Sequence, residues 1–197
     1  GHHVQPSPVA GWALARAHSV YQPATLAGFS ATLQKLHPVA GVVVAYGRII
    51  PKNVLDVFPA GIVNLHPSLL PRYRGPTPVQ QAIWDGAAET GVTIIRIDAQ
   101  LDHGPIIAQV RTPIGLVETA AELLTRLAEL GTQELLRVLP RYLAGAITPT
   151  PQAHDQATYT RPLKRDDGRV DWNAPAEAIY RQCRACQPWP GVFTRWQ

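Results

Sequence analysis

The stretch GIVNLHPSLLPRYRGPTP, from Gly61 to Pro78, indicates a buried strand and a candidate site at its end. Its first residues form a short apolar run that is typical of a buried strand, and the rest is a Pro-rich loop with two arginines. Asn64 and His66 lie at the end of the predicted strand. Open α/β sheets bind ligands beyond the carboxyl ends of their strands, so this amide and this imidazole are candidate functional groups.

Predicted strands and helices alternate along the chain, which indicates the α/β class with a mostly parallel, doubly wound, Rossmann-like sheet. Strands are predicted over 19–23, 41–46, 61–66, 91–97 and 105–110, and helices over 6–18, 25–37, 51–58, 78–85, 119–130, 132–143 and 175–185. The β-branched run that begins at Gly41 predicts a strand buried on both faces. Thr119 and Glu122 have the spacing of a capping box, and Gly131 is expected to end the helix that they begin.

The composition argues against some classes of protein. The chain has 197 residues, of which 46% are apolar, and this is enough for a sizeable core. It has no uninterrupted apolar run of about 18 residues, so we expect no membrane span. The net charge of +4 favours an ordinary basic surface and is compatible with an anionic partner such as RNA. Two cysteines suit a reducing cytoplasm and are too few for a structural zinc site, so we expect no metal.

Asp102 completes a candidate acyl-transfer site. It follows the predicted strand 91–97, and in a parallel sheet its loop would open at the same edge as Asn64 and His66. An amide and a protonated imidazole can donate to a carbonyl oxygen as it becomes an oxyanion, while a carboxylate favours the charged imidazole and can take a proton from an attacking amine. Each residue alone is explained as well by a structural role, so the hypothesis rests on all three together.

Two stretches, NLHPSLLPRYRG and ETGVTIIRIDAQLDHGPIIAQ, resemble the formyltransferase family that uses 10-formyltetrahydrofolate. The resemblance implies that Asn64, His66 and Asp102 are the catalytic residues. It also implies a tetrahydrofolate site formed by Ser68, Leu69, Leu70, Pro71, Tyr46, Gly47, Ile49, Ile97, Gln100 and Leu101. Backbone groups of the segments 44–50 and 97–101 would hold the flat pterin ring, whose edge carries donors and acceptors.

The last third of the chain, from ATYTRPLKRDDGRVDW to PWPGVFTRW, resembles the members of this family that formylate the methionine of initiator tRNA. The partners implied are initiator methionyl-tRNA and folate, for translation initiation by a monomer in the cytoplasm, or in an organellar matrix if the source is eukaryotic. Arg72 and Arg74 are either solvated loop charges or contacts to tRNA phosphates, and the resemblance favours the second role for one of them. The alternatives are formyl transfer to a sugar-nucleotide or glycinamide-ribonucleotide amine, and a non-catalytic fragment that binds folate or RNA.

The same resemblance predicts the domain organisation. Residues 1–146 are expected to be a formyltransferase catalytic domain that lacks its first strands, residues 147–168 a linker, and residues 169–197 the beginning of an OB-like β-barrel domain. The chain is thus expected to be a fragment truncated at both ends. One departure from the family pattern lies beside the site, where His103 follows Asp102; it is expected to face solvent rather than to modulate the pKa values of its neighbours.

Overall fold

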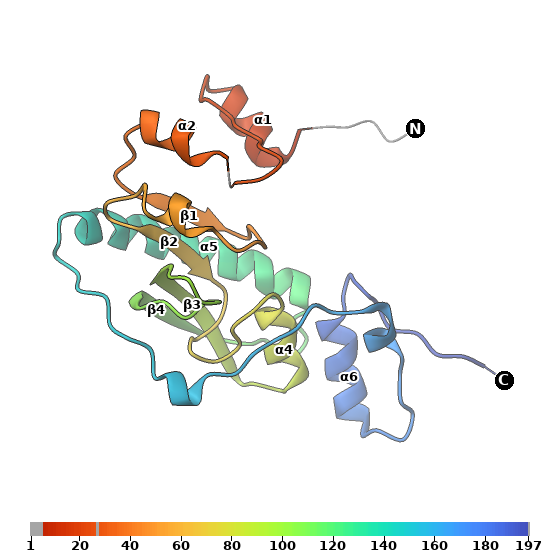
Figure 1. Ribbon diagram of the computed structural model, residues 1–197. Coiled ribbons are helices and arrows are strands. Elements are labelled where there is room, and N and C mark those ends of the chain that lie inside the picture. The colour runs from red at the N-terminus through yellow and green to blue at the C-terminus, as the bar shows by residue number, and fades with distance from the viewer. Residues whose placement is uncertain (1–5, 27, 197) are drawn as a thin grey trace.

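The computed structural model describes residues 6–26 and 28–196 and is built around a single four-stranded sheet (Figure 1). The strands lie side by side in chain order, namely β1 (Gly41–Val44), β2 (Ile62–His66), β3 (Glu89–Arg96) and β4 (Ile106–Pro113). The α-helices are α1 (Pro8–Leu14), α2 (Ser30–Lys35), α3 (Lys52–Leu55), α4 (Pro78–Trp84), α5 (Ala120–Leu143) and α6 (Ala176–Ala185). Two 3₁₀ turns, η1 (His154–Gln156) and η2 (Arg165–Gly168), lie between α5 and α6. Among the described residues, no helix is both long and apolar enough to cross a membrane.

The sheet is mixed, so the prediction of a mostly parallel sheet was wrong for the described strands. β1 and β2 are parallel, whereas β3 runs antiparallel to both β2 and β4. The sequence misled because six consecutive residues of β3 are buried, and such a run is typical of parallel strands. The α/β class itself is confirmed.

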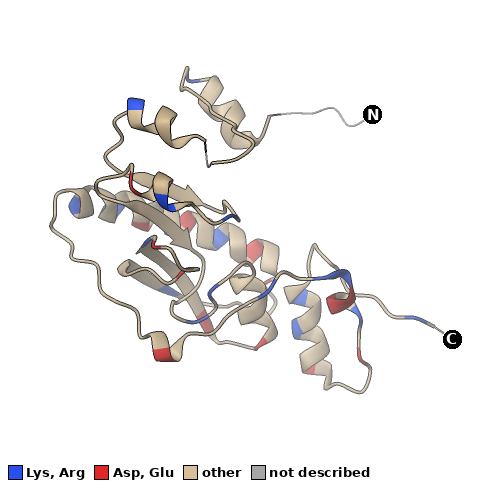
Figure 2. Ribbon diagram, in the orientation of Figure 1, with Lys and Arg blue, Asp and Glu red and all other residues tan. Residues whose placement is uncertain are grey.

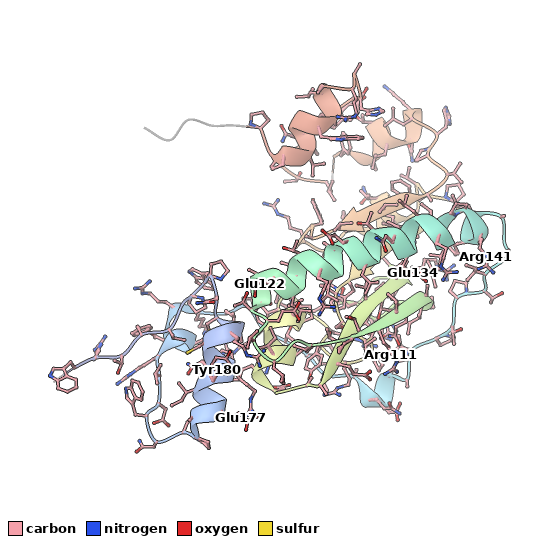
Figure 3. The ribbon with its side chains drawn as sticks, turned by 180° about the vertical axis from the view of Figure 1, so that it is seen from behind. Arg111, Glu122, Glu134, Arg141, Glu177 and Tyr180 are labelled. Carbon is pink, nitrogen blue, oxygen red and sulfur yellow. The ribbon has the colours of Figure 1, made fainter. Side chains whose placement is uncertain are left out.

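Helix α5 covers one face of this sheet (Figure 3). Its first turn has the predicted capping box between Thr119 and Glu122. The predicted break at Gly131 was wrong, because α5 is one helix of 24 residues that continues past Gly131 to Leu143. A Cβ atom at Gly131 would lie 2.7 Å from Leu65 and 2.9 Å from Val92, so the glycine lets the helix lie close to the sheet.

Strand β1 lies at the edge of the sheet and is not buried on both faces as predicted. Val42 and Val44 are 47% and 57% exposed, because the described residues leave one face of β1 uncovered. The predicted strand at 19–23 is also absent, and this segment is irregular in the structure. The helices expected over 6–18, 25–37 and 51–58 form with shorter bounds, as α1, α2 and α3.

After α5, the chain passes along the far edge of the sheet to reach α6 (Figure 1). Thr150 pairs with Ile106 at the start of β4, and Tyr159 pairs with Arg74 in the loop after β2. The segment 150–160, which we call the strap, is therefore hydrogen-bonded to the start of β4 and to the loop after β2. Helix α6 packs against α4, and Ala185 joins the apolar cluster beneath α5. The OB-like domain expected after the linker is not shown by the described residues, where a single bridge joins Arg169 to Phe193.

Candidate active site

Side chains of β2 alternate between the two faces of the sheet, and this alternation separates core from site. Val63 and Leu65 point toward α5 and are buried in its apolar clusters. Asn64 and His66 point to the opposite face, because successive residues of a strand alternate. On that face, the loop that follows β2 is fixed by Thr93 of β3, whose hydroxyl donates to Ser68 O at 2.6 Å and accepts from Leu70 N at 3.1 Å.

His66 is buried, with 4% of its surface exposed. Its Nε2 lies 2.9 Å from the carbonyl oxygen of Tyr73. A carbonyl can only accept, so Nε2 carries the hydrogen and the ring orientation is fixed. The other nitrogen, Nδ1, lies 3.7 Å from Oδ2 of Asp102, within the range of an ion pair.

Asp102 reaches His66 by a route that the sequence did not predict. Because β3 is antiparallel to β2, the carboxyl end of β3 lies beside the start of β2, at the opposite end of the strand from His66. The loop from β3 to β4 must therefore turn back, and Asp102 adopts a left-handed backbone conformation with φ of 46°. Gly104 lies so close to Arg96 O that a Cβ atom would be 1.8 Å from it. The carboxylate is held by the backbone N–H of Gly75, which donates to Oδ2 at 2.8 Å.

The charge state of His66 is governed mainly by burial. Burial lowers the pKa of His66 below its ordinary value of 6.5, and Asp102 and the Tyr73 carbonyl oppose this without reversing it. The expected charged imidazole does not fit this lowered pKa, because that expectation took account of the carboxylate and not of burial. In the structure, a neutral imidazole beside Asp102 forms a pair that can take up one proton.

Asn64 is partly exposed, and its side-chain amide makes no hydrogen bond within the described part of the chain. An amide with free donors, beside a histidine–carboxylate pair, is suited to bind an external carbonyl oxygen. No cluster of three or more His, Cys, Asp or Glu side chains able to hold a metal occurs in residues 6–26 and 28–196.

The residues expected to bind tetrahydrofolate fall into two groups. Ser68 and Leu70 are buried, and the Ser68 hydroxyl donates to Arg72 O at 2.7 Å, so they shape the loop itself. The others are more accessible, and they are the partly buried Leu69, Pro71 and Ile97 and the exposed Tyr46, Gly47, Ile49, Gln100 and Leu101. Ile97 and Ile50 belong to one apolar cluster, so the two predicted folate segments meet there.

The two arginines of the loop after β2 differ in exposure, since Arg72 is exposed and Arg74 is buried. Arg74 is 1% exposed, and its guanidinium donates to Gln152, Tyr159 and His154 of the strap. It is therefore not available to a tRNA phosphate, and the prediction for Arg74 does not fit this geometry. Arg72 is exposed and lies over the Tyr73 ring, so it stays the candidate for a phosphate contact. Elsewhere Lys and Arg are spread along the chain and are mixed with Asp and Glu in α5 and α6 (Figure 2), so charge alone does not locate an RNA-binding face.

His103 does not simply face solvent, so that expectation was wrong. Its Nδ1 lies 2.6 Å from Asp98, and its ring stacks on His154 of the strap at 3.9 Å. Sequence reasoning also missed the groups that fix the site, namely Tyr73, Gly75 and Gln152. Gly75 had a signal, since it is the last residue of the quoted stretch NLHPSLLPRYRG, but Gln152 lies in a polar segment that was interpreted as a linker.

Comparison with known proteins identifies the family of this chain. The family model described as formyl transferase matches residues 6–139, and the model of the formyl transferase C-terminal domain matches residues 162–197. The chain belongs to the formyl transferase family.

Its curated relatives include methionyl-tRNA formyltransferases. The enzyme of Chloroflexus aurantiacus (strain ATCC 29366 / DSM 635 / J-10-fl) is 47% identical over 194 residues, which cover 98% of this chain and 63% of the relative. The enzyme of a strain of Thermus thermophilus is 48% identical over 190 residues, which cover 95% of this chain and 61% of the relative. The chain therefore spans less than two thirds of the length of these relatives.

Solved structures show the same fold at lower identity. The N-formyltransferase from Helicobacter canadensis, in complex with folinic acid and dTDP-3-aminofucose, has a TM-score of 0.75 at 21% identity, over 90% of this chain and 63% of that one. HypX from Aquifex aeolicus, in complex with tetrahydrofolic acid, has a TM-score of 0.72 at 24% identity, over 84% of this chain and 28% of that one.

Proposed function

We propose that this protein transfers the formyl group of 10-formyltetrahydrofolate to the amino group of methionyl initiator tRNA. The observation that carries the proposal is the pair formed by His66 Nδ1 and Asp102 Oδ2, 3.7 Å apart, on the same face of the sheet as the amide of Asn64. An identity of 47% to a methionyl-tRNA formyltransferase over 98% of the chain supports the choice of tRNA as acceptor.

The side chains have separate tasks in this reaction. The amide of Asn64 donates to the formyl oxygen and stabilises the negative charge that develops there as the amine nitrogen bonds to the formyl carbon. The pair of His66 and Asp102 accepts the proton that the amine loses. When the bond from the formyl carbon to folate N10 breaks, the pair returns a proton to that nitrogen, so the enzyme ends in its starting state. Tyr73 and Gly75 keep the imidazole and the carboxylate in place.

Folate binding is proposed for the surface that flanks this pair. Tyr46, Ile49 and Leu101 expose apolar side chains on the two predicted folate segments, and such surface is suited to a flat aromatic ligand. The backbone of the segments 44–50 and 97–101 would supply the polar contacts. No metal is needed for the proposed steps, because the developing charge is met by hydrogen-bond donors.

The test is a formyl-transfer assay on the protein as its gene encodes it. Formylation of charged initiator tRNA should depend on 10-formyltetrahydrofolate, and sugar-nucleotide amines and glycinamide ribonucleotide should be poor acceptors. Preferred formylation of either small amine would overturn the choice of acceptor. Folate binding without any formyl transfer would overturn the catalytic proposal altogether.

We also propose that the enzyme is a cytoplasmic monomer, with a catalytic domain over 1–146, a linker over 147–168 and a second domain from 169 onward. The gap between the two family matches supports this division. Light scattering at micromolar concentration should give the mass of one chain, and a dimer mass would contradict the proposal.

A further inference from the structure

Gln152 of the strap occupies a position that neither family match includes, since they end at residue 139 and resume at 162. It is 5% exposed, although it is a polar residue in a polar segment. Its Nε2 donates to the carbonyl oxygens of Asp102 at 2.9 Å and Gly104 at 2.7 Å. Its Oε1 accepts from Arg74 Nε at 3.2 Å and Nη2 at 2.7 Å.

These four hydrogen bonds fill the capacity of the amide, which has two donor hydrogens and two acceptor lone pairs. Turning the amide over would set its NH₂ group against the guanidinium of Arg74 and its oxygen against two carbonyls. The orientation of Gln152 is thus fixed by its partners. Among the described residues, the guanidinium of Arg74 forms its other side-chain hydrogen bonds with Tyr159 and His154.

The Asp102 loop needs such support. Asp102 has a φ of 46°, a left-handed conformation that a residue with a side chain adopts only at an energetic cost. The carboxylate of Asp102 accepts a hydrogen bond from the backbone N–H of Gly75. The backbone carbonyl of Asp102 accepts its hydrogen bond from Gln152. A strained backbone persists where surrounding contacts determine it, and Gln152 supplies two of them.

We infer that Gln152 is a positioning residue for the formyl-transfer reaction, which it serves by holding the Asp102 loop so that the carboxylate faces His66. The inference rests on the proposed function for the role of Asp102. Arg74 anchors Gln152 from the opposite side, and the strap therefore forms part of the active-site architecture as well as a connection between two domains.

The test compares Gln152→Leu and Gln152→Glu with matched control variants, Gln156→Leu and Gln156→Glu. Gln156 is also in the strap, but it is exposed and its side chain makes no hydrogen bond in the described structure. Leu removes all four bonds without adding charge, whereas Glu keeps the acceptor for Arg74 and loses both donors. We expect kcat to fall about 10- to 100-fold in both Gln152 variants, with KM changed less than about threefold. The control variants should retain the kcat of the unmodified protein.

A second measurement is independent of activity. The amide of Gly75 donates to the Asp102 carboxylate, so its hydrogen exchange should speed up about tenfold in the Gln152 variants, while exchange of the Ile97 amide, bonded to Ile62, stays the same. If the unmodified protein transfers no formyl group, the proposed function fails and the exchange data still test the positioning. Unchanged kcat and unchanged Gly75 exchange would overturn the inference. So would unfolding of both Gln152 variants, since Gln152 would then support the fold as a whole.

Discussion

Replacing Gly131 by alanine should destabilise the protein, although the same change stabilises most helices. Gly131 lies in the middle of α5, where alanine is better than glycine by about 1 kcal/mol of helix propensity. The added methyl group would lie 2.7 Å and 3.0 Å from the two terminal carbons of Leu65 and 2.9 Å from Val92. Both neighbours are buried, and overpacking a core costs about 1–3 kcal/mol.

The close contacts involve three atoms of two side chains, which places the cost in the upper part of that range. The net effect of Gly131→Ala is then a loss of about 1–2 kcal/mol, or about 3–6 °C in Tm for a chain of this size. Urea unfolding followed by circular dichroism measures it. Ala128→Gly is the control, because Ala128 is exposed on the same helix and the change should cost about 1 kcal/mol of propensity alone. A Gly131→Ala protein more stable than the original would refute the packing argument.

Four further outcomes are expected. Asp102→Asn should keep the fold and lower kcat at least 100-fold in the formyl-transfer assay, because the amide cannot accept a proton; near-normal turnover would contradict its role. Arg72→Ala should weaken tRNA binding and reduce the slope of log K against log salt by about 1, as measured by filter binding at several salt concentrations. Because burial lowers the folded-state pKa of His66, the unfolded chain binds the proton more readily, and stability should fall as pH drops below about 6.5 in urea titrations; His66→Gln should reduce this dependence. Burial raises the pKa of Cys186 to about 11, so iodoacetamide at pH 8 should label Cys183 first, as peptide mass mapping would show.

The sequence predicted well wherever the signal was local. The strand that ends in Asn64 and His66 forms over Ile62–His66, and the capping box at Thr119 begins α5 as expected. Both patterns depend on residues within a few positions of one another. The pairing of His66 with Asp102 was predicted from residue type and order, and the distance of 3.7 Å fits it.

The errors arose where the deciding contact is distant in sequence. Strand direction depends on which strand pairs with which, and the buried run in β3 looks the same in a parallel and in an antiparallel sheet. Gly131 looks like a helix-ending glycine until Leu65 and Val92 are placed against it. Arg74 looks like a surface charge until the strap, almost 80 residues later, is seen to cover it.

The antiparallel direction of β3, which the sequence did not predict, explains why the Asp102 loop needs the strap. In a parallel sheet, the loop that carries Asp102 would open beside His66 without further help, as was first expected. In the mixed sheet, the loop must turn back across the edge, and this takes a left-handed Asp102, a glycine at 104 and a hydrogen-bonded support from outside the sheet. Gln152 provides that support, and it does so from a segment that also leads to α6. One short segment therefore both supports the loop of the candidate catalytic carboxylate and continues toward α6, so its path is set by the geometry of the site as well as by the need to connect two helices.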